Sequence, residues 1–314
     1  MSGAEPLDVL VLGELNPDLV LTGGDLTPRF GQVESLVAGS TLTLGSSGAI
    51  FAAGCARLGL RTAIAGLVGE DTFGRFVREQ LRDFGVATSG IVTDSTVATG
   101  LTVILNRGED RAILTHLGAM AQMTAAQVDT DLLARARHVH VTSYFLQRGL
   151  QPGLPGLLEQ ARRNGSTVSM DTNWDPDERW TDGLREALRH VDVFLPNEAE
   201  ALAITGATSV AAAAEELGRT VPELVVKLGA RGAETWLRGE RHQAAAIAVD
   251  VRDTTGAGDS FDAGYVHGLL AGLSVDERLR QACVCGALST RAIGGVGAQP
   301  TVDEVASIVR KPAP

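Results

Sequence analysis

The sequence predicts a doubly wound α/β fold, with a mostly parallel sheet and a small lid of β-strands. Two observations carry this prediction. Short apolar runs of strand length alternate with longer segments of helical period, and two segments in the first part of the chain break that alternation. Several runs are apolar on both faces, as expected of parallel strands covered by helices on each side. Ligands bind at the carboxyl ends of such strands, so functional residues are expected directly after them.

Strands of the main sheet are expected at residues 8–13, 62–67, 138–142, 167–171, 191–195 and 224–228. Helical periodicity predicts helices between them at residues 72–84, 151–163 and 210–217. The sequence contains no internal repeat and no linker-like tract, so we expect a single domain over residues 1–314.

The lid is expected at residues 17–44 and 99–115. The first segment has no helical period and combines Thr and Val with glycine turns. The second segment predicts a hairpin, with strands at 101–105 and 111–115 and a turn at 106–110. Isolated two-stranded ribbons are marginal in water, so apolar lid residues such as Val103 and Leu105 need a covering surface.

The charge of the chain excludes some partners. It carries 27 basic and 38 acidic residues, a net charge of −11. Such a surface gains little from nucleic acid or anionic membranes, so we expect neither as a partner. No stretch has the length of a transmembrane helix, and the first residues lack the features of a signal peptide. We therefore expect a cytoplasmic protein, and we expect its three cysteines to be core residues.

The most informative motif is Asp253-Thr-Thr-Gly-Ala-Gly-Asp259-Ser-Phe-Asp262. It follows the apolar run at 244–251 and precedes the helical pattern at 263–271. Its glycines allow a tight turn and close approach of the backbone to a ligand. The motif therefore predicts a loop that turns directly into a helix.

A helix that begins at this motif would face an anion with its first N–H groups, those of Gly256, Ala257 and Gly258. Asp259 lies in the same first turn, within reach of whatever group receives the anion. This combination suits phosphoryl transfer, which needs positioning, charge stabilisation and a residue that accepts the acceptor's proton. The alternative interpretation is a glycine-rich helix start with an ordinary N-terminal carboxylate.

A second motif lies nearer the N-terminus. A glycine turn and a small-residue helix run from Gly45-Ser-Ser-Gly48 to Gly59, and a strand and another glycine turn follow at residues 66–74. Taken alone, close packing of the helix on the sheet would explain it.

Together, the two motifs resemble the signatures of the ribokinase-like (PfkB) carbohydrate kinase family, in the family's order. The resemblance extends from Asp8 to about Gln299. It implies an enzyme that transfers the γ-phosphate of ATP, with Mg²⁺, to a hydroxyl of a sugar or sugar-like molecule. Asp259 would be the catalytic base, and Gly256, Ala257 and Gly258 would form the anion hole. In many relatives two lids pack together, so the resemblance also implies a homodimer through the lid.

The resemblance assigns substrate binding to residues at the carboxyl ends of strands and in the N-terminal motif: Asn16, Asp18, Gly45, Ser46, Ser47, Gly48 and Asn173. Two positions depart from the family. Ser46 stands where a second Gly is usual, and Ile50 stands where an Asn that binds sugar hydroxyls is usual. Ile50 removes a donor and an acceptor from the pocket, so the substrate is expected to be less hydroxylated or differently oriented.

Three alternatives stay open at this stage. A nucleoside such as adenosine would depend less on the missing Asn, and a non-catalytic sugar-binding relative would keep the fold without turnover. A phosphorylated sugar is less expected, because few basic residues lie near the early motifs; Arg29 and Arg111 of the lid keep it open.

For the cofactors, the resemblance implies ATP beside Lys227, Gly229, Gly232 and Thr255, and Mg²⁺ held, largely through water, by Asn197 and Glu200. It also implies a monovalent cation, K⁺, at Asp253 and Thr255, as in several relatives. From the residues alone, Asn197 equally fits a helix N-cap, and Lys227 equally fits a strand-end lysine in solvent. Trp174 and Trp180 are expected to be packing residues.

Overall fold

The computed structural model describes residues 6–107, 110–181 and 183–309. Within them, a nine-stranded sheet has the order β13-β12-β11-β10-β9-β8-β1-β4-β5. Its strands are β1 (Leu7–Leu12), β4 (Thr62–Gly69), β5 (Ile91–Asp94), β8 (Ala136–Val141), β9 (Thr167–Met170), β10 (Val193–Phe194), β11 (Glu223–Lys227), β12 (Ala233–Leu237) and β13 (Glu240–Ala244). Pairing is parallel from β5 to β11, and the edge hairpin of β12 and β13 is antiparallel.

The six strands expected from the sequence are all present, with ends that differ by one or two residues. Strands β5, β12 and β13 were not predicted. The first has only four residues, and the last, Glu-Arg-His-Gln-Ala, is polar because it forms the edge of the sheet. The run at 244–251 contributes only its first residue to a strand.

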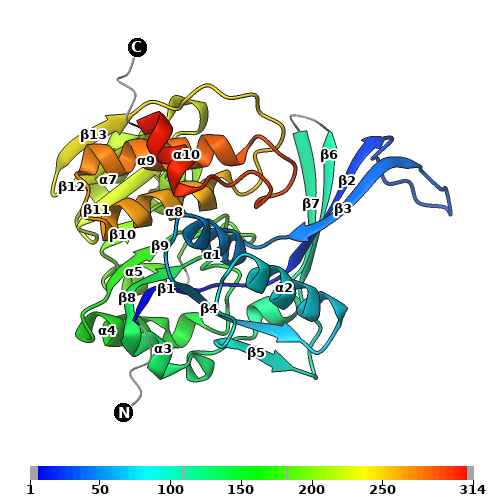
Figure 1. Cartoon of the computed structure of the whole chain (residues 1–314), viewed down its shortest axis with the longest axis horizontal. Helices are drawn as coiled ribbons and strands as arrows, with labels where there is room; N and C mark the ends of the chain where they lie inside the picture. The colour runs from blue at the N-terminus through cyan, green and yellow to red at the C-terminus, as the bar shows by residue number, and fades with distance from the viewer. Residues whose placement is uncertain (1–5, 108–109, 182, 310–314) are drawn as a thin grey trace.

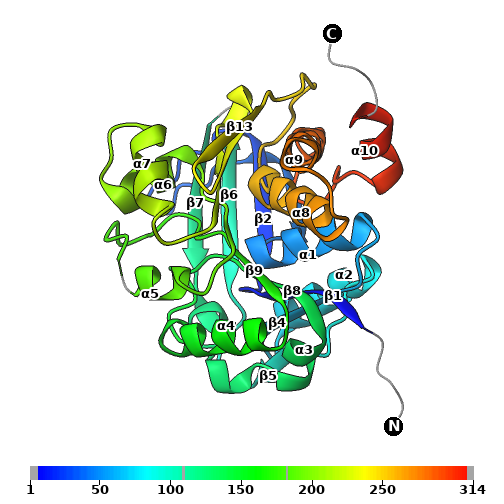
Figure 2. The same cartoon turned by 90° about the vertical axis from the view of Figure 1, so that its left-hand side faces the viewer.

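Helices cover both faces of the sheet (Figure 2). On one face lie α1 (Ser47–Arg57), α2 (Thr72–Asp83), α8 (Ala257–Leu270), α9 (Val275–Ser289) and α10 (Val302–Val309); on the other lie α3 (Thr130–Arg135), α4 (Leu154–Arg163), α5 (Leu184–Leu188), α6 (Glu198–Thr205) and α7 (Val210–Leu217). Alternate residues of β1 divide between the two cores: Val9 and Val11 pack with the first set, and Leu10 and Leu12 with the second.

The predicted lid is present and stands away from the main body (Figure 1). It is a four-stranded sheet of order β3-β2-β6-β7, made of β2 (Pro17–Gly24), β3 (Val37–Leu44), β6 (Leu101–Arg107) and β7 (Asp110–His116). Two antiparallel hairpins are joined by parallel pairing of β2 with β6. The predicted turn at 106–110 includes residues 108 and 109, which lie outside the described residues.

The register of the lid places a polar row of side chains next to an apolar row. One cross-strand row is Thr43, Asp18, Thr102 and Thr115, and the adjacent row is Leu42, Leu19, Val103 and Leu114. Neighbouring rows point to opposite faces of a sheet, so the polar row and the leucine row face apart. Leu42 is 40% exposed and Leu114 is 59% exposed, which leaves the apolar face open.

All three cysteines are buried and unpaired, as expected of core residues. In the described part of the chain, no helix has the length and apolar character needed to cross a membrane.

Candidate active site

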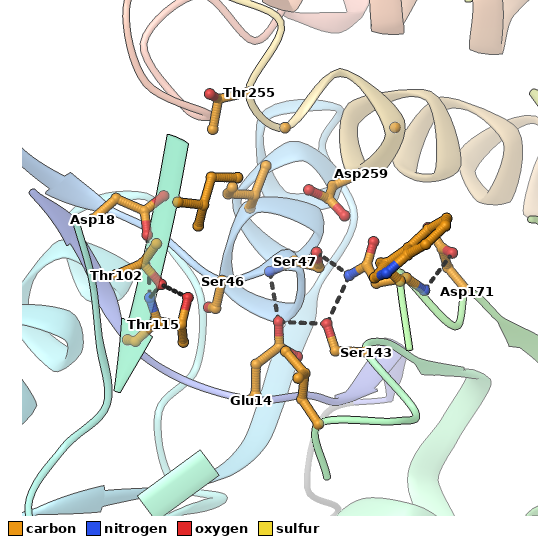
Figure 3. Close-up of a pocket in the computed structure, with 18 of the residues that line it drawn as sticks. Glu14, Asp18, Ser46, Ser47, Thr102, Thr115, Ser143, Asp171, Thr255 and Asp259 are labelled. Atoms are coloured by element: carbon orange, nitrogen blue, oxygen red, sulfur yellow. Dashed lines mark hydrogen bonds between the residues drawn. The ribbon is translucent and has the colours of Figure 1, made fainter. Parts of the chain in front are cut away.

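A cavity of about 870 Å³ lies where the main sheet, the lid and the N-terminus of α8 meet (Figure 3). Most of the site residues predicted from the sequence line this cavity, together with several residues that were not predicted. They are Glu14, Asn16, Asp18, Ser46, Ser47, Ile50, Thr102, Arg111, Ser143, Asp171, Asn173, Asn197, Glu200, Lys227, Gly229 and residues 254–259. The lid segment 99–115 therefore faces Asp259, as predicted.

Asp259 lies in the first turn of α8 and is 7% exposed. Burial and the neighbouring Asp171 raise the pKa of its carboxyl, Lys227 lowers it, and the net pKa is about 7. A carboxyl with a pKa near neutrality is well matched to accepting a proton from a hydroxyl.

The turn that starts α8 depends on Gly256. Its φ is +72°, and a Cβ at this position would lie 2.8 Å from the Cα of Gly295. Gly258 has no such constraint, because a Cβ there would meet the Lys227 Nζ at 3.6 Å, an ordinary contact. The tight turn therefore requires glycine at position 256 and not at position 258, and the close approach of a ligand to the backbone of Gly258 stays a prediction. The Ala257 N–H donates to the Thr254 carbonyl at 3.3 Å, which closes the turn before the helix.

Lys227 is not a solvent-exposed lysine. Its side chain is 12% exposed, and its Nζ lies 2.6 Å from Asp171 Oδ2 and 3.1 Å from Asp262 Oδ2. Glu200 also acts on its charge, and the carboxylates together raise the pKa of Lys227 although burial opposes them. One ammonium group therefore faces several carboxyl groups.

Asn197 is the N-cap of α6, and Glu200 completes a capping box with it. The Asn197 Oδ1 accepts from the Glu200 N–H at 2.9 Å, and the Glu200 Oε2 accepts from the Asn197 N–H at 2.8 Å. Glu200 is 3% exposed, and burial raises its pKa to about 7.

These residues fit a hydrated magnesium ion. Among the described residues, no group of three or more His, Cys, Asp or Glu could enclose a metal directly. The excess of buried carboxylates favours a cation, and Mg²⁺ keeps several of its waters when few protein oxygens are offered.

Asp18 faces the opposite wall of the cavity, and burial raises its pKa to about 7. Asn16 Nδ2 donates to Asp18 Oδ1 and to Thr102 Oγ1, both at 3.1 Å, and so links the end of the first strand to the lid. A Cβ on Gly45 would lie 2.1 Å from Asp18 Oδ1. Glycine at position 45 therefore makes the space for this carboxylate.

Ser46 adopts a φ of +60° and caps α1, its Oγ accepting from the Ala49 N–H at 3.2 Å. The family's usual glycine adopts this backbone conformation without strain. Ser46 adopts it with strain, but its hydroxyl provides the N-cap of α1. Gly48 packs closely, since a Cβ there would lie 2.8 Å from the Cα of Gly13. Ile50 is 3% exposed and lines the cavity where the family's Asn would stand.

Asp253 accepts hydrogen bonds from the Thr255 N–H and hydroxyl and from the Gly294 N–H. Arg111, from strand β7 of the lid, lies beside this pair, with its Nη1 2.9 Å from Thr255 Oγ1 and 3.9 Å from Asp253 Oδ1. These contacts connect the lid to the loop before α8.

Trp180 is buried, as expected of a packing residue, but Trp174 is 48% exposed and lines the cavity. The two rings pack edge to face at 4.8 Å. The packing interpretation is therefore wrong for Trp174.

Sequence reasoning missed four polar residues of the site: Glu14, Ser143, Asp171 and Asp262 as a partner of Lys227. The spacing of Asp262 from Asp259, three residues on one helix, could have indicated a shared face. Glu14 follows a strand directly and could have been found by the same rule that identified Asn16.

A second cavity, of about 540 Å³, adjoins the first across Lys227, Gly229 and Gly258. Its walls are mostly apolar and include Ile247, Val249 and Ala287, and Gly232 lines it too. An apolar slot that opens onto a helix N-terminus suits a purine base with its phosphates directed at the helix.

The doubly wound fold, the two joined cavities and a near-neutral carboxyl at a helix N-terminus define a nucleotide-dependent phosphotransferase. The model of the pfkB family of carbohydrate kinases matches residues 7–302. The chain belongs to this family, and it is a carbohydrate kinase.

The chain is 28% identical to the ribokinase of Haemophilus influenzae, with 94% of this chain and 95% of that protein covered. It is 32% identical to the fructokinase of Klebsiella pneumoniae, with 83% and 90% covered. Among solved structures, Arabidopsis thaliana ribokinase complexed with ribose and ATP matches with a TM-score of 0.85 and 24% identity, covering 98% of this chain and 100% of that one. An Escherichia coli protein solved with ATP and Mg²⁺ matches with a TM-score of 0.86 and 24% identity, covering 97% and 99%. At this identity the structures show the shared fold.

Proposed function

We propose that this protein transfers the γ-phosphate of ATP to a hydroxyl of a sugar or sugar-like molecule, with Asp259 as the general base. The position of Asp259 carries the proposal, because it lines the first cavity next to Gly258, which both cavities share. An acceptor hydroxyl bound beside Asp18 and Asn16 would give up its proton to Asp259 as its oxygen attacks the γ-phosphate. The N–H groups at the start of α8 would stabilise the charge that develops on the phosphate.

The residues on the nucleotide side would bind ATP and the metal ions. Lys227, Gly229, Gly232 and Thr255 would border ATP. Asn197 and Glu200 would hold Mg²⁺ through water, and the ion would neutralise phosphate charge when bound. We also propose K⁺ at Asp253 and Thr255, to be tested by comparing turnover in potassium chloride and in choline chloride.

The acceptor is best identified by a phosphorylation screen with Mg·ATP over ribose, fructose, 2-keto-3-deoxygluconate, a hexose phosphate and adenosine. ADP release that depends on a sugar supports the proposal. Adenosine is the second candidate, because Ile50, Ile104 and Ile113 give the acceptor cavity an apolar wall. If none of these acceptors supports ATP turnover but a sugar still binds, the protein would instead be a sugar-binding relative without activity.

Turnover is expected to fall as the pH falls through about 7. Burial raises the pKa of Asp259 from 3.8 to about 7, and a protonated carboxyl cannot accept the acceptor's proton. Activity should therefore be full above this pKa and lost below it, by about tenfold per pH unit. A profile of kcat/KM between pH 5 and 9 measures this, and a value of kcat/KM that does not fall between pH 7 and pH 5 would contradict the raised pKa.

We propose that the protein forms a homodimer through the apolar face of the lid. Two such rows packed together would cover Leu42 and Leu114, which the single chain leaves exposed, and Leu19 and Val103, which it leaves half-buried. Light scattering at micromolar concentration should give twice the mass of one chain.

Leu114→Asp should convert the dimer to a monomer, because it places a charge in the centre of that interface. Val302→Asp is the matched control, since Val302 is 43% exposed and lies on α10 rather than on the lid. A wild-type monomer, or dissociation of both variants, would reject the lid as the interface.

A further inference from the structure

Trp174 leaves a large aromatic surface open to the first cavity. It is 48% exposed, and it lines that cavity together with Ile113 of strand β7, which is 52% exposed. The other large apolar side chains that are strongly exposed in the described part of the chain do not line this cavity. Apolar surface left in water is costly, and a ligand in the cavity would cover it.

The indole of Trp174 is the exposed end of a series of aromatic rings that runs into the core. It packs edge to face on Trp180, with ring centroids 4.8 Å apart and an interplanar angle of 88°. Trp180 packs in the same way on Phe145 at 5.5 Å, and Phe145 on Tyr144 at 5.3 Å. These three rings are buried. An edge-to-face contact covers at most one face of a ring, so at least one face of Trp174 stays clear of Trp180.

The loop around Trp174 is fixed on both sides of it. After it, the buried Asp175 accepts from three N–H groups further along the loop at 2.8–3.0 Å, those of Asp177, Arg179 and Trp180. Before it, Asn173 has a φ of +53°, and its Nδ2 donates to the Ser143 hydroxyl at 2.7 Å. Backbone strain of this kind persists only where the surroundings hold it in place. The ring is therefore preorganised, which lowers the entropy lost when a ligand binds to it.

The rest of the cavity wall combines hydroxyl-binding groups with apolar ones. Asn16 and Asp18 can hold hydroxyls, but Ile50 offers no hydrogen bond where the family has an Asn. On the lid, Ile104 and Ile113 are cross-strand partners, and both line the cavity. An acceptor held by its hydroxyls would therefore meet apolar surface from the lid and from the main domain.

We propose that Trp174 is a specificity-determining residue: its indole stacks on the apolar face of a ring in the acceptor and so selects cyclic acceptors over open-chain polyols. This inference rests on the proposed function, because the acceptor is the molecule that Trp174 selects. Two rings share the required chemistry. One is the sugar ring itself, whose C–H groups form an apolar face, and the other is a planar base joined to the sugar.

The test is calorimetric binding without ATP to ribitol, ribose and adenosine, and to mannitol and fructose. The wild-type protein should bind a ring-containing compound more tightly than its open-chain counterpart. Trp174→Leu keeps an apolar side chain but removes the aromatic face. It should weaken binding of a sugar ring by about three- to tenfold, and of a stacked base by up to about a hundredfold. Trp174→Phe should stay within a few-fold of the wild-type affinity. A loss confined to adenosine identifies the base as the stacked ring, and a loss shared with ribose or fructose identifies the sugar ring.

The matched control is Trp236→Leu, the same substitution on strand β12, because Trp236 lines neither cavity. Its affinities should equal those of the wild type. Fluorescence gives a measurement that a merely structural role would not change. Binding of the ring-containing compound should alter the tryptophan emission of the wild type and of Trp236→Leu, but not that of Trp174→Phe, which still binds.

Three results would overturn the inference: wild-type protein that binds none of the ring-containing compounds, equal wild-type affinity for rings and open chains, or a Trp174→Leu variant that binds rings as the wild type does. Binding is measured without turnover. A wild-type protein that shows the expected binding but phosphorylates no acceptor would therefore refute the proposed function and leave the role of Trp174 in selecting rings intact.

Discussion

Replacing Asp259 by Asn is expected to lower kcat by roughly 10²–10⁴-fold, the usual contribution of a general base. Asn keeps the size of the side chain and removes its ability to accept a proton. The fold should be preserved, because burial disfavours the charged form of Asp259 and a neutral amide meets no such penalty. ATP binding should also be nearly unchanged, since the N–H groups of α8 and the apolar slot remain.

The measurement is kcat with the acceptor found in the screen, together with calorimetric affinity for Mg·ATP. Asp250→Asn is a suitable control, because its side chain is 86% exposed and pairs only loosely with Arg252 at 3.3 Å. Near-normal turnover in Asp259→Asn would remove this residue from the mechanism.

Gly256→Val should lower kcat by roughly 10²–10³-fold, the loss seen when a donor of an oxyanion hole is displaced. Valine disfavours the φ of +72°, and its Cβ would collide with the backbone of Gly295 and with Ile50. The start of α8 must then shift, and its N–H groups would no longer point at the phosphate.

Gly258→Ala is the matched control for this effect. It lies two residues further along the same helix, has an ordinary φ and leaves room for a Cβ. Its kcat should stay within a few-fold of the wild-type value, and ATP affinity should weaken only in Gly256→Val. Equal losses in both variants would show that bulk near the phosphates, and not the turn at Gly256, limits catalysis.

The main sheet and the lid could be predicted from the sequence because local patterns specify them. Alternating apolar runs and helical periods identify six strands of the main sheet, and the strand character of residues 99–115 has no place in a doubly wound sheet. The edge strand β13 escaped prediction because an edge is not covered on both sides, so its sequence lacks the apolar signal.

The residues that line the site were easier to predict from the sequence than the contacts between them. Lys227 could not be assigned from sequence, because its environment depends on Asp171 and Asp262, which come from other elements. The difference between Gly256 and Gly258 likewise arises from the distant Gly295, which a local motif does not contain. Sequence patterns therefore located helix α8, and tertiary contacts determine the surroundings of each of its residues.

The parallel pairing of β2 with β6 has a consequence for how the cavity opens. It ties two hairpins from distant parts of the chain into one plate, which is tethered to the main domain by four chain crossings. Gly45, Gly100 and Gly118 lie at three of these crossings, and the Arg111 contact to Thr255 adds a latch. One hairpin cannot swing out alone without breaking this pairing, so the two hairpins would move together as one plate. Acceptor entry and product exit would then pass through the same hinge motion and share one barrier.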